Sequence, residues 1–518
     1  MISVLAFLGQ EPIGEELLEP AVQTPSVDWA AVAPILALAL GGILLLTVAS
    51  VSRWLPRSFA TAWTVASAAL SAGFAVHLWN RVGDEGPWST VAEAVGVDRF
   101  SVFLTIVICA GVVLAALLAD GYLRHEDAVP SPEVYVLMLL SAAGGVVMTM
   151  ANDLIVLFLG LEVLSIAVYV LAAMHLRRSQ SQEAGMKYFV LGAFSSGFLL
   201  YGIALVYGAT GSVNLVTIRA FLEQNTLLDN GMLLAGFALL LVGLGFKIAA
   251  VPFQVWVPDV YQGAPTPVAA YMASVVKTAA FAAILRVFVL AFATQRTDWQ
   301  PLVYFLAVAS MVVGSVVAVA QTNVKRMLAY SSIAHAGFIL VGVQAASDEG
   351  TAAALFYLAA YTFMVAGSFG VVTLVAGRGD GHHRLEDYRG LGQRAPLVAF
   401  AFMVLLFGQA GIPLTSGFLA KFGVIAAAVE ARSFWLAAVA MLAAVISAFV
   451  YLRIIVSMYM SDDESDAGES LLGRIAPTTW AVLGLAVVAT IGLGIVPGPV
   501  IDWAGEAIPE LVADAPLP

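Results

Sequence analysis

Charged residues are scarce in this chain, and cysteine is almost absent. Lys, Arg, Asp and Glu make up 11% of the 518 residues, whereas 61% are hydrophobic. Soluble domains carry roughly 25% charged residues, so the surplus apolar surface is expected to face lipid. The single cysteine, Cys109, excludes a disulfide framework, a cysteine-ligated iron–sulfur cluster and a CxxC metal site within the chain. It lies in an apolar run, where we expect it to serve packing alone.

Several kinds of functional segment are also missing. The formal net charge is −12 and the acidic residues cluster in loops and tails, so nucleic-acid binding is not expected. The N-terminal segment MISVLAFLGQEP has no basic residue before its short apolar run, so it is not expected to be a signal peptide. No nucleophile triad, metal cluster or phosphate loop is visible, which argues against an independent catalytic enzyme.

Long hydrophobic runs, in contrast, are abundant. A helix needs about 20 apolar residues to cross a hydrocarbon core of ~30 Å. The predicted spans 1 to 14 lie at residues 29–52, 58–79, 98–119, 132–150, 153–176, 184–209, 230–257, 265–294, 299–321, 323–346, 350–376, 395–430, 432–460 and 474–503. We therefore predict an all-α, multi-pass membrane protein with about fourteen transmembrane helices.

The basic residues of the predicted loops favour one orientation, because Lys and Arg collect on the cytoplasmic side. With the N-terminus outside, the outer loops carry only Arg81, Arg219 and Arg296, with Arg432 nearby. The inner loops then carry Arg53, Arg57, Arg124, Arg177, Arg178, Lys325, Arg326, Arg378, Arg384, Arg389 and Arg394. Both termini are therefore expected outside. The acidic segment 461–470 would lie inside, but acidic residues matter little to this rule.

Lysine occurs at only five positions, and most of them are unusual. Lys247, Lys277 and Lys421 lie deep in long uncharged stretches, and Lys187 lies near the inner end of span 6. Lys325 opens span 10 and is interpreted as an inner-surface anchor. Arginine supplies almost every loop charge. A buried lysine can gain or lose a proton near neutrality, whereas arginine stays protonated, which explains why lysine lies in the spans.

Two other ionisable residues lie at a comparable depth. Glu162 is about 14 Å along its helix from Asp153, at about 1.5 Å per residue, and His335 has a similar depth in span 10. A charge at mid-membrane costs at least ~2.5–3.5 kcal/mol, so this set of residues predicts an interior polar path. Arg286 and Arg453 lie nearer span ends and are expected to extend toward the interface.

A static interpretation of these residues stays open. Glu162 and one lysine could form a buried ion pair that only locks two helices together. His335 alone is equally compatible with a hydrogen-bonded core residue and with a proton relay. The whole set of three lysines, a glutamate and a histidine favours the polar path.

Spans 7 and 12 each contain an interruption. Pro252 follows Lys247 by five residues in span 7, and Gly411 and Pro413 lie in the middle of span 12. Proline removes a helical hydrogen bond, and freed backbone groups inside a membrane need protein or water as partners. Paired interrupted helices indicate internal repeats around a midplane site. Both helices are therefore expected to be broken where water reaches them.

An offset of five spans turns the second unit over in the membrane. We predict two inverted five-helix repeats, spans 4–8 and spans 9–13, in which Glu162 corresponds to His335. The register is approximate, because Lys247 precedes its proline whereas Lys421 follows its proline by eight residues. The predicted domains are 1–130 (N-terminal tail and spans 1–3), 131–297 (first repeat), 298–462 (second repeat) and 463–518 (span 14 and C-terminal tail).

Two segments carry a family resemblance. FKIAAVPFQVWVPDVYQGAPTPVAAYMASVVKTAAF (246–281) and YSSIAHAGF (330–338) resemble the antiporter-like subunits of respiratory complex I and of Mrp-type cation/proton antiporters. The resemblance extends over nearly all fourteen spans. Within the family, KYFVLGAFSSGFLLYGIALVYGATGS (187–212) is most similar to the N-type subunits of bacterial NADH:quinone oxidoreductase. Lys421 stands where M-type subunits have a glutamate.

The resemblance implies roles in proton transfer. Glu162 and Lys247 would form a charged pair whose opening modulates the pKa of the lysine, and Lys277 would be the central proton carrier or connector. His335 would bridge the central axis, Lys421 would be the terminal exchange residue, and Lys187 would belong to the inner uptake region. Many members read PFHLW where this chain reads PFQVW. Gln254 cannot carry a proton near pH 7, so a relay role is not expected at that position.

The resemblance also implies how the chain works with others. Redox chemistry elsewhere would drive inside-to-outside proton translocation, with no cofactor in this chain and NADH, FMN, iron–sulfur clusters and quinone in other subunits. The partners would be other membrane-arm subunits, including a second antiporter-like subunit, together with membrane lipids and protons. The location would be the bacterial inner membrane. Two alternatives stay open: an Mrp-type cation/proton antiporter subunit, and a scaffold whose buried charges only hold helices together.

Overall fold

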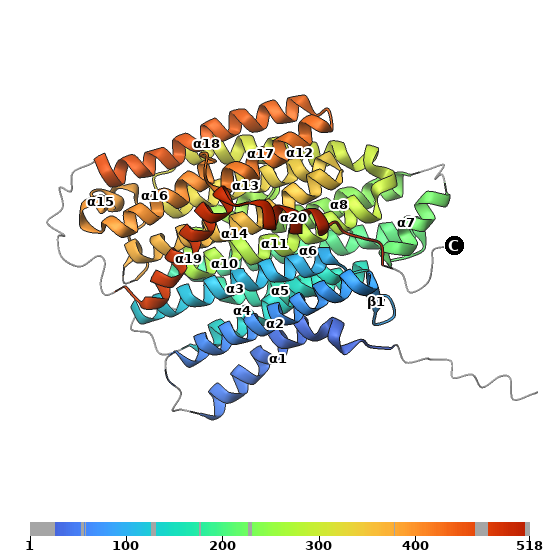
Figure 1. Cartoon of the computed structure of the whole chain (residues 1–518), viewed down its shortest axis with the longest axis horizontal. Coiled ribbons are helices and arrows are strands. Elements are labelled where there is room, and N and C mark those ends of the chain that lie inside the picture. The colour runs from blue at the N-terminus through green and yellow to red at the C-terminus, as the bar shows by residue number, and fades with distance from the viewer. Residues whose placement is uncertain are drawn as a thin grey trace, which may run out of the picture.

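The computed structural model describes residues 26–52, 56, 58–125, 131–175, 178–225, 230–377, 379–460 and 475–512. The expectations for the N-terminal segment and for the acidic segment 461–470 lie outside these residues. The helices run side by side, so that β1 (Trp88–Thr90) and α7 (Leu215–Gln224) lie at one end and α15 (Leu391–Arg394) at the other (Figure 1). We call these ends the hairpin face and the α15 face.

Eleven of the predicted spans each contain one long helix. They are α1 (Trp29–Val51), α2 (Phe59–Glu85), α3 (Arg99–His125), α4 (Pro132–Met150), α5 (Leu154–Ala173), α6 (Ser179–Thr210), α12 (Arg296–Val319), α13 (Val324–Ala345), α14 (Asp348–Ala376), α18 (Phe434–Met460) and α19 (Pro477–Ile495). Span 8 is a continuous helical segment of four parts: α10 (Thr266–Tyr271), the π-helix η3 (Met272–Val276), α11 (Lys277–Ile284) and the π-helix η4 (Leu285–Ala291).

The predicted breaks in spans 7 and 12 are both present. Span 7 consists of α8 (Gly231–Ile248), the short 3-10 helix η2 (Phe253–Trp256) and α9 (Val257–Gly263). Span 12 consists of α16 (Pro396–Ala410) and α17 (Ser416–Glu430). Ala249 and Gly411, directly after α8 and α16, have left-handed φ angles of 66° and 86°, which stop a right-handed helix. The breaks therefore begin before the prolines.

The all-α, multi-pass membrane fold is confirmed. Within the described residues, thirteen helical segments are long and apolar enough to cross a membrane. The remaining predicted span is span 12, whose two halves of 15 residues each are too short to cross alone. The predicted fourteen spans and the thirteen long segments therefore agree.

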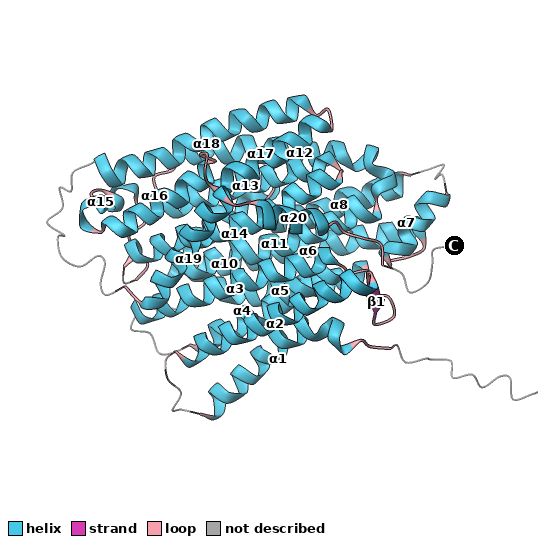
Figure 2. Ribbon diagram, viewed as in Figure 1, coloured by secondary structure: helices cyan, strands magenta, loops and turns pink. Residues whose placement is uncertain are grey.

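Several small elements were not predicted. β1 pairs with β2 (Val95–Val97) in an antiparallel hairpin, the only sheet in the described part of the chain (Figure 2). Amphipathic α7 follows α6, and α20 (Gly498–Glu506) follows α19, so predicted span 14 is two helices. The 3-10 helices η5 (Ala293–Gln295) and η6 (Leu385–Tyr388) complete the described elements. β1 and α7 lie at one end of the bundle, whereas α20 packs against α14 and α3 (Figure 1).

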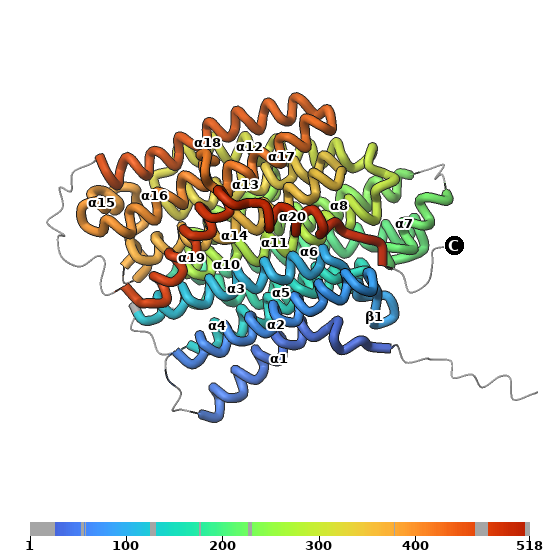
Figure 3. The backbone as a smooth tube through the Cα atoms, viewed as in Figure 1, coloured from blue at the N-terminus to red at the C-terminus, as the bar shows by residue number. Residues whose placement is uncertain are grey.

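The bundle has a buried centre and a lipid-exposed periphery. In the most apolar windows of α13 and α14, 94% of the residues are buried, whereas in α1, α2 and α18 only 33% are. α13 and α14 lie in the middle of the bundle, with α1 and α18 at opposite edges (Figure 3). Polar side chains of the central helices are therefore screened from lipid on all sides.

A short backbone crossing occurs twice. In each crossing, the backbone at the start of one helix forms two hydrogen bonds with the loop that follows the next helix. Each residue of the second crossing lies 170 positions after the corresponding residue of the first. The pairs are Leu154 N to Val213 O and Leu215 N to Asn152 O before α5, then Val324 N to His383 O and Leu385 N to Thr322 O before α13. The first lies on the hairpin face and the second on the α15 face.

Candidate functional site

Lys247 lies in the last turn of α8, next to the break in span 7. Its side chain is 3% exposed, and its Nζ donates a hydrogen bond to the hydroxyl of Tyr169 at 3.1 Å. The ammonium group also lies 4.9 Å from the Tyr169 ring and 5.3 Å from the Tyr188 ring. A cation at the C-terminal end of a helix is favoured by the helix dipole. The helix end that the break creates therefore stabilises the positive charge of Lys247 through the helix dipole.

Glu162 lies two turns before Tyr169 on α5, but it does not touch Lys247. No nitrogen–oxygen contact within 4.0 Å joins the two side chains, and Oε1 of Glu162 is buried without a hydrogen-bond partner. Tyr169 instead occupies the hydrogen-bonding position beside Lys247. The predicted charged pair is therefore open in this structure.

Lys277 lies at the first residue of α11, directly after η3, in the buried centre. Its Nζ donates to the carbonyl oxygen and to the hydroxyl of Ser332 on α13, both at 2.6 Å. The Tyr361 ring of α14 lies 5.6 Å from the ammonium group. π-helical turns are rare and are frequent at functional sites, because they shift a side chain out of the regular register.

His335 continues this polar cluster along α13. Its Nδ1 lies 2.6 Å from the Tyr357 hydroxyl, and its Nε2 lies 3.1 Å from the Tyr451 hydroxyl of α18. The Tyr451 hydroxyl lies 2.5 Å from Oγ of Ser331. Each of these groups can both donate and accept a hydrogen bond. The histidine, the two tyrosines and the serine therefore form a continuous hydrogen-bonded network.

Gln409 connects this network to Lys421. Ser331 donates to Oε1 of Gln409 at 3.4 Å, and Lys421 Nζ donates to the backbone carbonyls of Gln409 at 2.8 Å and Ala410 at 3.0 Å. These carbonyls are free to accept because α16 ends at Ala410. Lys247 and Lys421 thus share a feature that their spacing from proline hid. Lys247 lies in the last turn of the first half-helix α8, and the ammonium group of Lys421 binds the carbonyls at the end of the first half-helix α16.

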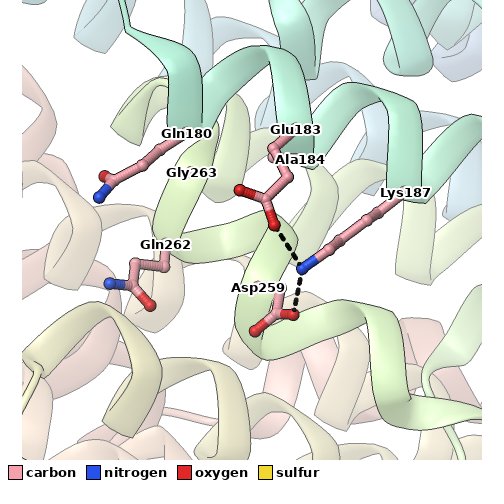
Figure 4. Close-up of a pocket in the computed structure, with 7 residues that line it drawn as sticks. All are labelled: Gln180, Glu183, Ala184, Lys187, Asp259, Gln262 and Gly263. Carbon is pink, nitrogen blue, oxygen red and sulfur yellow. Dashed lines mark hydrogen bonds and ion pairs between the residues drawn. The ribbon is translucent and has the colours of Figure 1, made fainter.

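Lys187 lies away from the central line, near the α15 face. Its Nζ contacts Glu183 at 2.7 Å and Asp259 at 2.9 Å, and 42% of its side chain is exposed. Arg326 contacts the other oxygen of Asp259 at 2.8 Å. Lys187, Glu183 and Asp259 border a hollow of about 180 Å³ between α6 and α9 (Figure 4). Lys187 therefore belongs to a surface network and not to the buried cluster.

A family model described as NADH:quinone oxidoreductase/Mrp antiporter, transmembrane, matches residues 151–447. The chain belongs to this family. It is 44% identical over 417 residues to NADH-quinone oxidoreductase subunit N 1 of Solibacter usitatus, a match that covers 80% of this chain and 85% of that protein. All six predicted site residues lie within residues 151–447, the part of the chain that the family model matches.

Two solved structures share the fold of this family member. A chain of respiratory complex I from Thermus thermophilus is 32% identical, with a TM-score of 0.76 over 91% of this chain and 99% of that chain. A chain of the Mrp complex from Dietzia sp. has a TM-score of 0.80 over 92% and 97% of the two chains, at 23% identity. The second likeness shows the fold alone.

The interpretation of Lys325 as an inner-surface anchor is wrong. Lys325 is fully buried, and its Nζ lies 3.1 Å from Oδ2 of Asp380, which also contacts Arg178 at 2.8 Å. Thr266 and His383 contact Oδ1 of Asp380. Burial alone would raise the pKa of Asp380, but the charge of Lys325, with His383 and Arg178, holds it well below its usual range. This cluster ties four segments together at the α15 face.

The expectation that Arg286 extends to the interface is also wrong. Arg286 is fully buried in η4, with Nη2 2.5 Å from Oδ1 of Asp98 and Nε donating to the Thr149 carbonyl at 2.6 Å. Asp98 is fully buried as well. Arg453, in contrast, donates to the carbonyls of Val319 and Gln321 at the C-terminal end of α12. Sequence reasoning missed the Asp98–Arg286 pair, although an aspartate at the start of an apolar span could have been a signal.

The side chains that contact these lysines and His335 include neutral polar groups that could not be recognised from the sequence. Tyr169, Ser332, Tyr357, Tyr451 and Gln409 are uncharged, so a search for ionisable residues in apolar runs did not select them. Cys109 is buried in the hydrophobic core. Within the described residues, no group of three His, Cys, Asp or Glu side chains could hold a metal ion.

Proposed function

We propose that this chain is a proton-translocating membrane-arm subunit of NADH:quinone oxidoreductase. The observation that carries the proposal is the line from Lys277 through Ser332 and His335 to Lys421, whose side chains are all buried although they come from both central and peripheral helices. Its members are mostly groups that can pass protons. The similarity to a subunit N of NADH-quinone oxidoreductase supports the assignment.

The first step of the relay takes place at Lys247. Glu162 and Lys247 are apart, and the Tyr169 hydroxyl holds the lysine. A charge change at the neighbouring subunit would draw Glu162 toward or away from Lys247, because a carboxylate that approaches a lysine favours its charged form. Opening of this pair then releases the proton of Lys247 toward the centre.

The second step crosses from Lys247 to Lys277. Tyr188 stacks on Trp256 with 4.3 Å between ring centroids, and Trp256 lies 6.3 Å from Tyr261 of α9. Aromatic rings cannot themselves carry protons, so water must enter beside this stack, where the broken span 7 leaves backbone groups for it. The proton then reaches Lys277 and its partner Ser332.

The third step runs along the hydrogen-bonded network. Water carries the proton from Lys277 and Ser332 to His335, and the hydroxyls of Tyr451 and Ser331 carry it onward. Water then links Ser331 to Lys421, because the contact of Lys421 with Gln409 is to the backbone carbonyl. Moving one charge against 100 mV costs ~2.3 kcal/mol, so redox chemistry elsewhere must supply at least that much per proton. NADH, FMN, iron–sulfur clusters and quinone would belong to the other subunits, and no cofactor is required in this chain.

The arrangement of the helices supports two inverted repeats, residues 131–297 and 298–462. The two backbone crossings lie on opposite faces and match at a constant offset of 170 positions. With that register, Glu162 is equivalent to Ser332, one turn from the predicted counterpart His335. The remaining domains would be residues 1–130 and 463–518. Both termini would lie outside, with the α15 face toward the cytoplasm of a bacterial cell.

A second candidate is a subunit of an Mrp-type cation/proton antiporter. The fold of the Dietzia Mrp chain is compatible with it. The two candidates differ in their coupling: an antiporter moves sodium against protons without NADH, whereas the proposed subunit needs NADH oxidation. The identity to a subunit N favours the oxidoreductase.

Membrane vesicles that carry the assembled complex test the proposal. Lys277→Met should abolish most NADH-driven acidification in sodium-free buffer, whereas the wild-type complex should acidify equally with and without sodium. Sodium-dependent acidification without NADH would identify the antiporter instead. Unchanged acidification in an assembled Lys277→Met complex would leave the scaffold interpretation.

A further inference from the structure

The Asp98–Arg286 pair lies on the same continuous helical segment as Lys277, toward the hairpin face. Arg286 lies nine positions after Lys277, or about 14 Å further along the helical segment at 1.5 Å per residue. Each of the two charges lies at a π-helical turn, Lys277 directly after η3 and Arg286 within η4. No step of the relay described above uses Arg286 or Asp98. A fully buried ion pair costs desolvation energy, and so invites a functional explanation.

Two buried polar atoms near this pair have no hydrogen-bond partner in the described part of the chain. They are Nη1 of Arg286, a donor, and Oδ1 of Asn152, an acceptor. Arg286 Nε binds the Thr149 carbonyl near the end of α4, and Asn152 follows three residues later. Buried polar groups without a protein partner are normally satisfied by ordered water. A donor and an acceptor at the same helix end suit one water molecule.

Hydroxyl groups surround the same place. Thr105 and Thr149 lie 3.4 Å apart between α3 and α4, and both are fully buried. Ser101, one turn before Thr105, donates its backbone N–H to Oδ1 of Asp98 at 2.9 Å. The hydroxyls of Thr105 and Thr149 could form further hydrogen bonds with a water molecule near Arg286. The pocket around the ion pair is therefore polar, although apolar helices enclose it.

The C-terminal segment covers the pair on the outer side. Glu510 donates its backbone N–H to Oδ2 of Asp98 at 3.2 Å, and Nδ2 of Asn152 donates to the Val512 carbonyl at 3.0 Å. Ala507 and Val512 are buried, whereas Glu510 is exposed. Burial, together with the charge of Asp98, raises the pKa of Glu510. Glu510 is thus a titratable group between Asp98 and the solvent of the hairpin face.

We propose that Asp98, Arg286 and Asn152 form an outward proton exit for the first repeat, covered by the segment Ala507–Val512. The proposal rests on the proposed function. On this second route, which branches from the one through His335, a proton that leaves Lys277 reaches the water held by Arg286 and Asn152, and protonates the Asp98 carboxylate while Arg286 moves away. Asp98 then passes the proton to the Glu510 carboxylate, which releases it to outer water. One proton enters and one leaves, and Asp98 returns to its paired state.

Other charges on this face provide a matched control. Arg99 is the neighbour of Asp98 in sequence, and its guanidinium pairs with Glu506 at 2.6 Å. Both of these side chains are partly exposed, at 29% and 49%. Glu506→Gln removes a carboxylate from the same face without touching the buried pair, so it should leave proton release unchanged.

The experiment measures protons released per NADH oxidised by the intact complex in proteoliposomes. Asp98→Asn should lower this ratio in the assembled complex, and Glu510→Gln should slow proton release at an unchanged rate of uncoupled NADH oxidation. Because Asp98→Asn leaves Arg286 unpaired and can prevent folding, Asp98→Asn combined with Arg286→Gln removes both charges together. The double variant should show the same lowered ratio.

Two outcomes would overturn the exit. One is a wild-type ratio in the assembled double variant, which would make the pair a static link between α3 and η4. The other is wild-type proton release in Glu510→Gln, and this result alone would refute the exit if neither Asp98 variant assembles. If Lys277→Met also pumps normally, the proposed function fails with it. If Lys277→Met abolishes pumping while these variants are normal, only the exit fails.

Discussion

Lys277 and Ser332 meet at the centre of the bundle, although 55 positions separate them in the chain. The lysine binds both the carbonyl oxygen and the hydroxyl of this serine at 2.6 Å. Among the described residues, no carboxylate lies within 4.0 Å of its Nζ. Its partners are neutral oxygens, so no fixed negative charge holds its proton in place. This distinguishes Lys277 from Lys325, which is held by Asp380.

Ser332→Ala should impair coupled turnover without loss of assembly. It removes one of the two acceptors of Lys277 and leaves the carbonyl, and a hydrogen bond to a charged group contributes ~1.5–3 kcal/mol. We expect a several-fold loss of NADH-driven acidification. Ser315→Ala is the control, because Ser315 is also buried and, among the described residues, its hydroxyl bonds only to that of Ser447, at 2.8 Å, outside the proposed path. Equal effects of the two substitutions would contradict a special role for Ser332.

Tyr451→Phe should interrupt the network between His335 and Lys421. The substitution keeps the ring and removes the hydroxyl that contacts both His335 and Ser331. We expect slower proton transfer and a larger solvent isotope effect on coupled NADH oxidation. Tyr388→Phe is the matched control, because Tyr388 is equally buried and its hydroxyl has no partner among the described residues. A Tyr451→Phe complex as active as the control would remove Tyr451 from the relay.

Asp380→Asn should destabilise the α15 face by roughly 3–5 kcal/mol, because it leaves Lys325 as an uncompensated buried charge. The pKa of Asp380 is lowered from its ordinary 3.8 on folding, so the carboxylate stabilises the folded state above about pH 4. That contribution is lost as the pH falls further toward the folded-state pKa. Thermal unfolding of the solubilised complex should show a large difference from wild type at pH 7. A difference that stays constant down to the acid limit would refute this assignment.

Gly417→Ala should disrupt the break in span 12. A methyl group at Gly417 would overlap the carbonyl oxygen of Gly408, across the gap between α16 and α17. We expect loss of activity together with poor assembly, since the half-helices must separate and the carbonyls that hold Lys421 must move. Gly484→Ala on exposed α19 meets no atom within 4 Å and should be neutral. A functional, well-assembled Gly417→Ala complex would show that this close approach is dispensable.

The spans and the lysines deep within them could be predicted because both are recognised from a short stretch of sequence. An uncharged run of about 20 residues identifies a helix in lipid, and a lysine within it is conspicuous. The breaks in spans 7 and 12 were predicted for the same reason, from Pro252 and Pro413. The location of the ammonium groups at half-helix ends needed the structure, because Lys421 returns to α16 from the far side of the break.

The charge pairs could not be predicted, because their partners are distant in sequence. Arg286 and Asp98 are 188 positions apart, and Lys325 and Asp380 are 55 apart. The distance of Arg286 or Lys325 from a span end says nothing about a carboxylate in a distant loop. Tyr169 and Tyr451 were missed for a different reason, since tyrosine is common in apolar helices and is not conspicuous there.

The central claim is that the charge of Lys247 starts the relay, and Lys247→Ala tests it most directly. NADH-driven quinone reduction and proton release are recorded together in vesicles with the intact complex, after a native gel confirms assembly. The relay predicts that proton release and coupled turnover collapse while assembly holds. Normal rates of both in the assembled variant would contradict it, and would make the buried charge of Lys247 a structural feature.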